Sequence, residues 1–461
     1  MGRGRAAGKS RAEPTAKRAK REGRANPRQD ADSICNFAAG GWTGREFLNA
    51  DDAVDLKGIF GHCIVAAGNR IWCLGGCRET RPLSRKMSVL ELQLESKTWT
   101  NRSKLLPEDS VPCCRWGHAS CLIPSRPVPD GPRPVEQFVW LAGGFNSHCN
   151  LNDVWRFCPT DGRFARVASE VSSLPYRAAY HSMVCDDVAK RLLAFGGQCC
   201  VGGPYQFFDR VVMHQLCRPK TGWQVVRVEG PRPAARAQHA AAMTTSGLMV
   251  IYGGGNATRT FRDVWTLHLS SSACWSEVKI FGRIRPWISL QLKHQDFNVI
   301  ACRPFMAAHH NGIMVLGRNK HAGAIGDAGY LGLWTLNLDA PYWRPVKATG
   351  APAWAGNFAA TVVDADNCSL EGRGKALLVF GGEDAGDSGQ ASRIGVPLAQ
   401  GGLWRLDLTA RPSEILLRTL RRACRARSAL PEEALEVIIS FTLGQLLDVA
   451  ANVPIVCGKK K

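Results

Sequence analysis

The sequence predicts an all-β protein built from six similar units, with a basic tail before them and a short helical segment after them. Apolar runs that end in one or two glycines recur every 53 to 68 residues. Each unit adds further marks in the same order, and Gly and Pro residues separate its short β-forming runs. We therefore expect three parts, covering residues 1–35, 40–410 and 411–461.

The first part is a basic tail. The chain has 461 residues, 45% of them hydrophobic, so it can bury a large core, and its formal net charge is +20. Residues 1–28 hold ten Lys or Arg against two Glu and almost no large apolar side chains. Such a segment cannot offset the entropy lost on ordering, so residues 1–35 are predicted to be disordered.

A compact cluster in this tail has the composition of a nuclear-targeting signal: Lys17, Arg18, Lys20 and Arg21. It also attracts nucleic-acid phosphates non-specifically. The alternatives are a solvated tail that carries no targeting signal and, with less support, an Arg-rich organelle transit peptide. No apolar signal segment follows Met1, so we expect a nuclear or cytoplasmic protein whose 18 cysteines are free thiols.

The repeated units share a fixed order of marks. A histidine precedes the apolar run in four units, as Gly61-His62, Gly117-His118, Tyr180-His181 and Gln238-His239. The glycine pairs end the runs IWCLGG (71–76), FVWLAGG (138–144), RLLAFGG (191–197), LMVIYGG (248–254) and ALLVFGG (376–382), with IMVLG (313–317) as a degraded copy. Segments such as DVWRF (153–157) and LWRLDL (403–408) follow, and each unit thus offers about four strands.

A four-stranded sheet with two apolar faces is not stable alone, so the units must stack face to face in a radial arrangement that protects their edges. A second aromatic residue closes most units: Trp99, Phe164, Trp223, Trp275 and Trp343. Because these residues recur in unit after unit, they are predicted to pack between sheets rather than to hold a cofactor, and no cofactor is expected.

Together these marks resemble the kelch repeat over roughly residues 60–408. The resemblance implies a six-bladed kelch-type β-propeller that acts in protein–protein interactions. The fifth unit departs from the pattern, with Arg303-Pro304-Phe305 where a histidine is expected and Gly317-Arg318 in place of a glycine pair. The sixth has Asn357-Phe358 at the histidine position.

Two segments could supply the last strand of the sixth unit. One is SEILLRTL (413–420), and the other is the segment from Trp42 to Phe47. The helical periodicity of residues 413–425 favours the N-terminal segment, which would lock the ring as a clasp.

The last part is predicted to form two short amphipathic helices. Ser428 and Pro431 suit a helix start, and Leu435, Ile438 and Ile439 lie on one face. Leu446 and Leu447 begin a second apolar stripe. Polar residues interrupt residues 437–456, so no membrane anchor is expected.

This segment resembles the F-box at Leu430, Pro431, Glu433, Ile439, Ser440, Phe441, Leu446, Leu447, Ala450, Val456 and Cys457. A neighbouring alternative is an elongin-binding box at residues 419–424 followed by a cullin-binding box at Leu430-Pro431. Either resemblance implies docking onto a cullin-RING ubiquitin ligase through a Skp-type or elongin linker. The docking residues would be Leu430, Pro431, Leu435, Ile438, Ile439, Leu446 and Leu447. The other alternative is a helical pair packed on the propeller.

Four arginines fall near the start of the first strand in successive units: Arg115, Arg177, Arg236 and Arg303. If they converge on one mouth of the propeller, they suit an acidic peptide or a carboxylate. The alternative is that each arginine pairs with a loop carboxylate of its own blade.

The function that follows is a substrate-recognition adaptor of a cullin-RING ligase, which binds an acidic or short linear partner at the mouth. The alternative is a kelch scaffold without ligase coupling, which would be nuclear if the basic tail is a targeting signal. An enzyme is the least supported class, because His309-His310 is the sole adjacent histidine pair and has no third ligand, so neither a catalytic nor a metal site is predicted.

Overall fold

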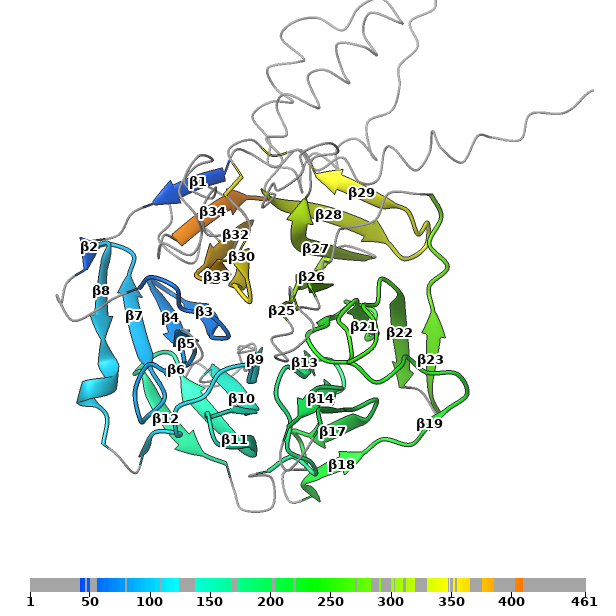
Figure 1. Cartoon of the computed structure of the whole chain (residues 1–461), viewed down its shortest axis with the longest axis horizontal. Helices are drawn as coiled ribbons and strands as arrows, with labels where there is room; N and C mark the ends of the chain where they lie inside the picture. The colour runs from blue at the N-terminus through cyan, green and yellow to red at the C-terminus, as the bar shows by residue number, and fades with distance from the viewer. Residues whose placement is uncertain are drawn as a thin grey trace, which may run out of the picture. The chain divides into compact units, whose positions relative to one another are not determined.

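The computed structural model describes residues 42–45, 48–49 and most of residues 56–408, with gaps in the connecting segments. These residues form six main β-sheets arranged radially around a common axis (Figure 1). The described residues therefore form the all-β, six-bladed propeller that the sequence predicts. We number the blades 1 to 6 in the order of their innermost strands.

The strands of each blade run outward from the axis in antiparallel order. Blades 1 to 3 consist of β3 (Cys63–Ala67), β4 (Arg70–Leu74), β7 (Val89–Gln93) and β8 (Thr98–Asn101); β9 (Ala119–Ile123), β10 (Phe138–Phe145), β11 (Asn150–Cys158) and β12 (Arg163–Arg166); β13 (Ser182–Asp186), β14 (Arg191–Phe195), β17 (Val211–Gln215) and β18 (Trp223–Val225). Blades 4 to 6 consist of β20 (Ala240–Met243), β21 (Met249–Tyr252), β22 (Val264–Leu269) and β23 (Ala273–Glu277); β26 (Phe305–His309), β27 (Gly312–Asn319), β28 (Tyr330–Asn337) and β29 (Trp343–Val346); β31 (Ala359–Asp364), β32 (Lys375–Phe380), β34 (Leu403–Asp407) and β1 (Trp42–Arg45).

Smaller elements complete the described part of the chain. Two short strands extend the outer edges of blades 1 and 4, and a 3-10 helix follows β8. These elements are β2 (Leu48–Asn49), β19 (Val228–Glu229) and η1 (Arg102–Leu105). Four two-stranded sheets pair β5 (Cys77–Arg78) with β6 (Arg81–Pro82), β15 (Gln198–Cys199) with β16 (Gln206–Phe207), β24 (Leu290–Gln291) with β25 (Ile300–Ala301), and β30 (Ala355–Gly356) with β33 (Glu383–Asp384).

The N-terminal segment closes the ring. Strand β1 pairs with β34 and becomes the outermost strand of blade 6, as the sequence favoured (Figure 1). The register places Trp42 opposite Leu406, just as Trp99 lies opposite Leu92 in blade 1. In blade 6, Trp42 therefore occupies the register position that Trp99 occupies in blade 1. The sixth unit has no such aromatic residue directly after its third strand. The competing segment, residues 413–420, lies outside the described residues.

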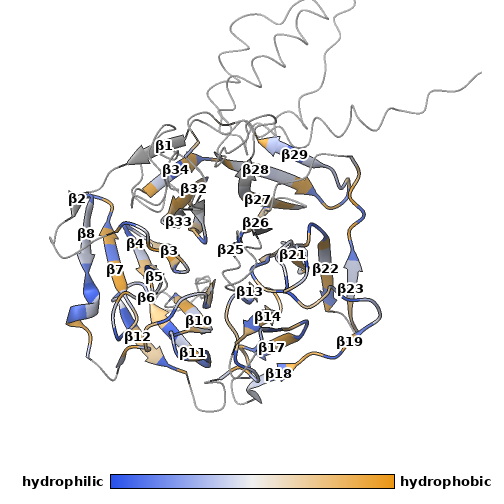
Figure 2. Cartoon of the chain, viewed as in Figure 1, coloured by the Kyte–Doolittle hydropathy of each residue, from blue (hydrophilic) through white to orange (hydrophobic). Residues whose placement is uncertain are grey.

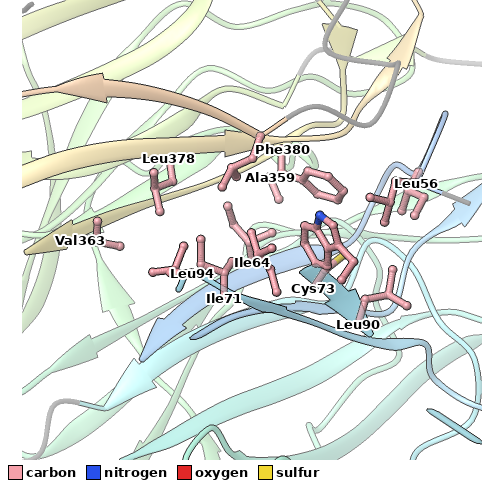
Figure 3. Packing of buried hydrophobic residues seen from close by; sticks show 14 of the residues in the cluster. Leu56, Ile64, Ile71, Cys73, Leu90, Leu94, Ala359, Val363, Leu378 and Phe380 are labelled. Carbon is pink, nitrogen blue, oxygen red and sulfur yellow. The ribbon is translucent and has the colours of Figure 1, made fainter. Parts of the chain in front are cut away.

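Six apolar clusters fill the spaces between neighbouring blades. In the cluster between blades 6 and 1, Ile64 and Ile71 lie in one group with Val363 and Leu378 (Figure 3). Hydrophobic residues predominate in the central strands of the blades, for example β7 and β22 (Figure 2). Burial of each such large side chain stabilises the fold by roughly 1.5–3 kcal/mol, so the blades hold one another together.

The repeated aromatic residues lie in these clusters, as predicted. Four of them are buried, and Trp223 packs half-buried against the cluster between blades 2 and 3. The buried four are Trp99, Phe164, Trp275 and Trp343. The described cysteines are free thiols, and those in the strands of blades 1 and 2 are mostly buried.

The glycine pairs give the next blade room to approach. A Cβ atom on Gly143 would lie 2.6 Å from the carbonyl oxygen of Ala178 and 2.9 Å from Cε1 of His181, both in blade 3. The second glycine, Gly144, donates its N–H to that same carbonyl at 2.9 Å. In blades 1 to 4, the histidine ring thus packs on the glycine pair of the preceding blade. The relation recurs for Gly75 with His118, Gly196 with His239 and Gly381 with His62.

Blade 5 keeps the sheet but lacks this interlock. Pro304 occupies the histidine position, because Phe305 pairs with Leu316 as Cys63 pairs with Leu74 in blade 1. Strand β27 runs straight through the single Gly317, which lies opposite Gly332. The missing marks therefore changed the local contacts of the fifth unit and left its four strands in place.

Candidate functional site

A ring of six residues surrounds the axis where the innermost strands begin. It comprises the residue before the histidine position of each blade: Gly61, Gly117, Tyr180, Gln238, Arg303 and Asn357. We call this set the central ring. Backbone N–H groups connect its members from blade to blade: Gly61 donates to Asn357, Gly117 to Gly61, Tyr180 to Gly117 and Gln238 to Tyr180, at 2.6–3.1 Å.

The central ring stores backbone strain. Tyr180, Gln238 and Asn357 have φ values of 57°, 59° and 52°, a left-handed region that side chains with a Cβ atom rarely adopt. The ring of Tyr180 lies over Gly117, where any Cβ atom would come within 2.9 Å of the aromatic carbons. Strained positions of this kind gather at functional sites, which directs attention to this end of the propeller.

Four buried histidines lie directly beneath the central ring: His62, His118, His181 and His239. Burial lowers the pKa of His62 to about 4 and, together with the charge of Arg303, the pKa of His181 to about 3. Burial and nearby arginines hold the pKa values of His118 and His239 well below the usual range. All four imidazoles are therefore neutral at pH 7.

Acid is expected to destabilise the protein because these histidines remain neutral when folded. Between pH 6.5, the ordinary histidine pKa, and about 4, the pKa of folded His62, the unfolded chain binds more protons than the folded protein. The free energy of unfolding therefore decreases as the pH is lowered through this window, by up to about 1.4 kcal/mol per pH unit for each histidine. Urea unfolding at pH 7.5, 6.5 and 5.5 measures it.

The matched variants are His62→Gln and His148→Gln, since His148 is exposed. We expect His62→Gln to show a weaker dependence on pH and His148→Gln to keep that of the unsubstituted protein. Equal slopes in all three proteins would contradict this assignment.

Arg115 and Arg236 form the same ion pair in blades 2 and 4, each between a buried arginine and a partly exposed aspartate. Arg115 binds both carboxylate oxygens of Asp153 at 2.7 Å, and Arg236 binds those of Asp263 at 2.6 and 2.9 Å. Both arginine side chains are fully buried. Each also donates to the carbonyl oxygen of the first glycine of its own pair at 3.1 Å.

The aspartates of these pairs each accept one more hydrogen bond. The indole N–H of Trp155 donates to Asp153 at 2.7 Å, and that of Trp265 donates to Asp263 at 2.8 Å. Burial alone would raise the pKa of both carboxyl groups, but the arginine hydrogen bonds and charge outweigh it and hold each pKa below its ordinary value. In blades 2 and 4, the Asp and Trp of the Asp-Val-Trp sequence therefore form the same hydrogen-bonded group with the arginine.

Blade 3 inverts this arrangement. Ala178 occupies the position of Arg115 and Arg236, three residues before the histidine, and Arg210 occupies that of the aspartates, directly before β17. Arg210 is exposed, and the described residues provide no carboxylate for it. The exposed Arg177 donates to the carbonyl oxygen of Asn150 at 3.1 Å and lies 3.8 Å from the Cys149 sulfur, again without a described carboxylate partner.

The four predicted arginines thus occupy three different positions. Arg115 and Arg236 lie three residues before the histidine position, Arg177 lies four before it, and Arg303 lies in the central ring itself. For Arg115 and Arg236 the alternative of an aspartate partner in the same blade holds. Ligand binding by the four residues stays a prediction.

Sequence reasoning missed Arg210 and the role of the aspartates, although a signal was present. Among the six units, only the two with arginine three residues before the histidine position carry aspartate before the third strand. Ser88, Arg210, Gly332 and Gly402 stand there in the others. Because the arginine and the aspartate occur together in the same two units and in no other, the sequence already indicates that they pair.

The remaining predicted sites lie outside the described residues. They are the basic cluster of Lys17, Arg18, Lys20 and Arg21, and the docking segment from Leu430 to Leu447. Within the described ranges, no three His, Cys, Asp or Glu side chains gather as metal ligands would. The same part of the chain contains no helix with the length and apolar character needed to cross a membrane.

Comparison with known proteins adds a family assignment for the first four blades. The model of the KLHDC2/KLHL20/DRC7 Kelch-repeats domain matches residues 61–292. The match begins at Gly61, in the central ring, and covers the blades that carry the histidine and glycine marks.

A second comparison finds similarity to part of a much longer protein. The chain is 25% identical over 218 residues to tip elongation aberrant protein 1 of Schizosaccharomyces pombe. The alignment covers 46% of this chain and 17% of the relative, so the chain spans only a small part of that protein.

Proposed function

Because the chain belongs to the KLHDC2/KLHL20/DRC7 Kelch-repeats domain family, we propose that it is a substrate-recognition adaptor of a cullin-RING ubiquitin ligase. Kelch propellers mediate protein–protein interactions. In this proposal, the partner presents an acidic or short linear segment to the propeller end that carries the central ring. The C-terminal residues 430–447 then dock a Skp-type or elongin linker.

The proposal of an acidic partner depends on blade 3, in which the arginine and aspartate positions of blades 2 and 4 are occupied by Ala178 and Arg210. Where blades 2 and 4 neutralise an arginine with an aspartate, blade 3 presents exposed Arg177 and Arg210 without a carboxylate partner among the described residues. Guanidinium groups bind carboxylates through paired, charge-assisted hydrogen bonds, so these two side chains suit Asp or Glu side chains of a partner. Arg115 and Arg236 support the same end of the propeller from within.

Charge reversal in blade 3 tests this surface. We expect the Arg177→Glu, Arg210→Glu variant to bind a fluorescein-labelled hexaglutamate peptide at least about tenfold more weakly than the unsubstituted protein, in fluorescence anisotropy at low salt. The matched control is Arg163→Glu, Arg218→Glu, which also reverses two exposed arginines, both at the opposite end of the blades from the central ring. Equal weakening in the control would mean that net charge alone drives binding and that blade 3 is not the site.

The ligase connection needs its own test, because it depends on the sequence of a segment outside the described residues. We expect full-length protein to recover a cullin together with its Skp-type or elongin linker, as identified by mass spectrometry. The Leu435→Asp, Ile439→Asp variant should lose both proteins while keeping its melting temperature. If the unsubstituted protein recovers neither, the alternative of a kelch scaffold without ligase coupling holds.

A further inference from the structure

Arg303 carries a positive charge that no described residue neutralises. It occupies the blade 5 position of the central ring, and its guanidinium makes no hydrogen bond or ion pair with the described residues. The fully buried Arg115 and Arg236, in contrast, each bind an aspartate through two hydrogen bonds. Arg303 is partly exposed to solvent.

The groups around Arg303 are neutral at pH 7. Its charge, after burial, lowers the pKa values of His118, His181 and His239, whose imidazoles are uncharged. Burial raises the pKa of the nearby Cys63 thiol to about 11, so this group is also uncharged. Desolvation lowers the pKa of Arg303 itself. A cation withdrawn from water without a counter-ion is unfavourable, and a bound anion removes that penalty.

Neighbouring residues of the central ring offer further polar groups. Gln238 in blade 4 and Asn357 in blade 6 flank blade 5, and both are buried. The side-chain amide oxygens of these two residues have no hydrogen-bond partner among the described residues. Rotating a terminal amide by half a turn exchanges its oxygen for an NH₂ donor, so each can turn a donor toward an anion.

We propose that the centre of the ring binds a small oxyanion against the Arg303 guanidinium, with the Gln238 and Asn357 amides as additional donors. Phosphate, sulfate and a carboxylate group share the required chemistry. The oxyanion is either a free ion or the carboxylate of a segment inserted by a partner. This site is separate from the blade 3 surface and does not depend on ligase coupling.

Thermal unfolding of the full-length protein tests the site directly. At constant ionic strength set with chloride, we expect inorganic phosphate and acetate to raise the melting temperature saturably, by about 3 °C. Arg303→Gln should abolish this rise, Arg303→Lys should keep part of it, and the surface control Arg218→Gln, at an exposed arginine, should keep all of it. An undiminished rise in Arg303→Gln would overturn the proposal.

A second measurement remains informative if Arg303→Gln folds poorly. In buffer without oxyanions, Arg303→Met should melt at a higher temperature than the unsubstituted protein, and saturating phosphate should remove this advantage. A lower melting temperature of Arg303→Met in that buffer would indicate a protein counter-ion and would overturn the proposal.

The hexaglutamate peptide separates the two sources of the oxyanion. If phosphate and acetate have no effect but the peptide raises the melting temperature of the unsubstituted protein and not of Arg303→Gln, the ligand is a partner's carboxylate. If none of the three probes has an effect that depends on Arg303, the proposal is wrong. Blade 3 is tested separately, because Arg177→Glu, Arg210→Glu leaves Arg303 in place.

Discussion

Replacement of Asp263 by alanine is expected to lower the free energy of unfolding by about 3–5 kcal/mol. Arg236 is fully buried, and Asp263 is its counter-ion through two hydrogen bonds of 2.6 and 2.9 Å. The substitution leaves the arginine charge buried without compensation and also removes the acceptor of the Trp265 indole. Urea unfolding followed by tryptophan fluorescence measures the loss.

Two further variants separate this effect from general damage. The double variant Arg236→Met, Asp263→Ala removes both charges and should recover part of the loss, because an apolar side chain of similar length fills the site. Asp209→Ala breaks an exposed contact of 3.7 Å with Arg232 and should cost less than about 1 kcal/mol. If Asp263→Ala also cost less than about 1 kcal/mol, the Arg236–Asp263 pair would not be needed for stability.

Gly143→Ala is expected to destabilise the protein by about 2–4 kcal/mol, from steric overlap and backbone strain together. The new Cβ atom would meet the Ala178 carbonyl oxygen at 2.6 Å, and a backbone atom of another blade cannot move aside as a flexible side chain can. The φ of 60° adds strain. Thermal unfolding should show a single transition at a lower temperature.

Gly68→Ala is the matched control for this substitution. Gly68 also has a positive φ, 55°, but nothing lies within 4 Å of the position that a Cβ atom would take there. Strain alone should cost about 1 kcal/mol at this residue. If both variants lose the same stability, contact between the blades is not what requires glycine at Gly143.

The blade count and most strands were predictable because each depends on a local, repeated pattern. Closure of the ring by the N-terminal segment was favoured because the competing residues 413–425 have a helical periodicity, and in the structure β1 pairs with β34. The interlock of one blade's histidine with the previous blade's glycine pair could not be predicted from a single unit. Its two partners belong to different repeats, and only the curvature of the ring brings them together.

The candidate site was less predictable because a shift of a single residue changes the role of an arginine. Arg177 lies one residue earlier than Arg115 and Arg236 do relative to their histidines, and it is exposed where they are buried. Composition alone cannot distinguish these positions. The aspartates paired with Arg115 and Arg236 lie in a different strand, so the pairing is visible only when the units are aligned with one another.

The β1–β34 pairing also has a consequence for synthesis of the protein. The ribosome makes β1 before every other described strand, yet its partner in the sheet is the last of them, so β1 must wait until the other described strands have been made. Until then the incomplete sixth blade presents an unpaired strand edge, which invites association with other chains. Ring closure is therefore a late, long-range step, and the nascent protein depends most on protection from aggregation just before this step.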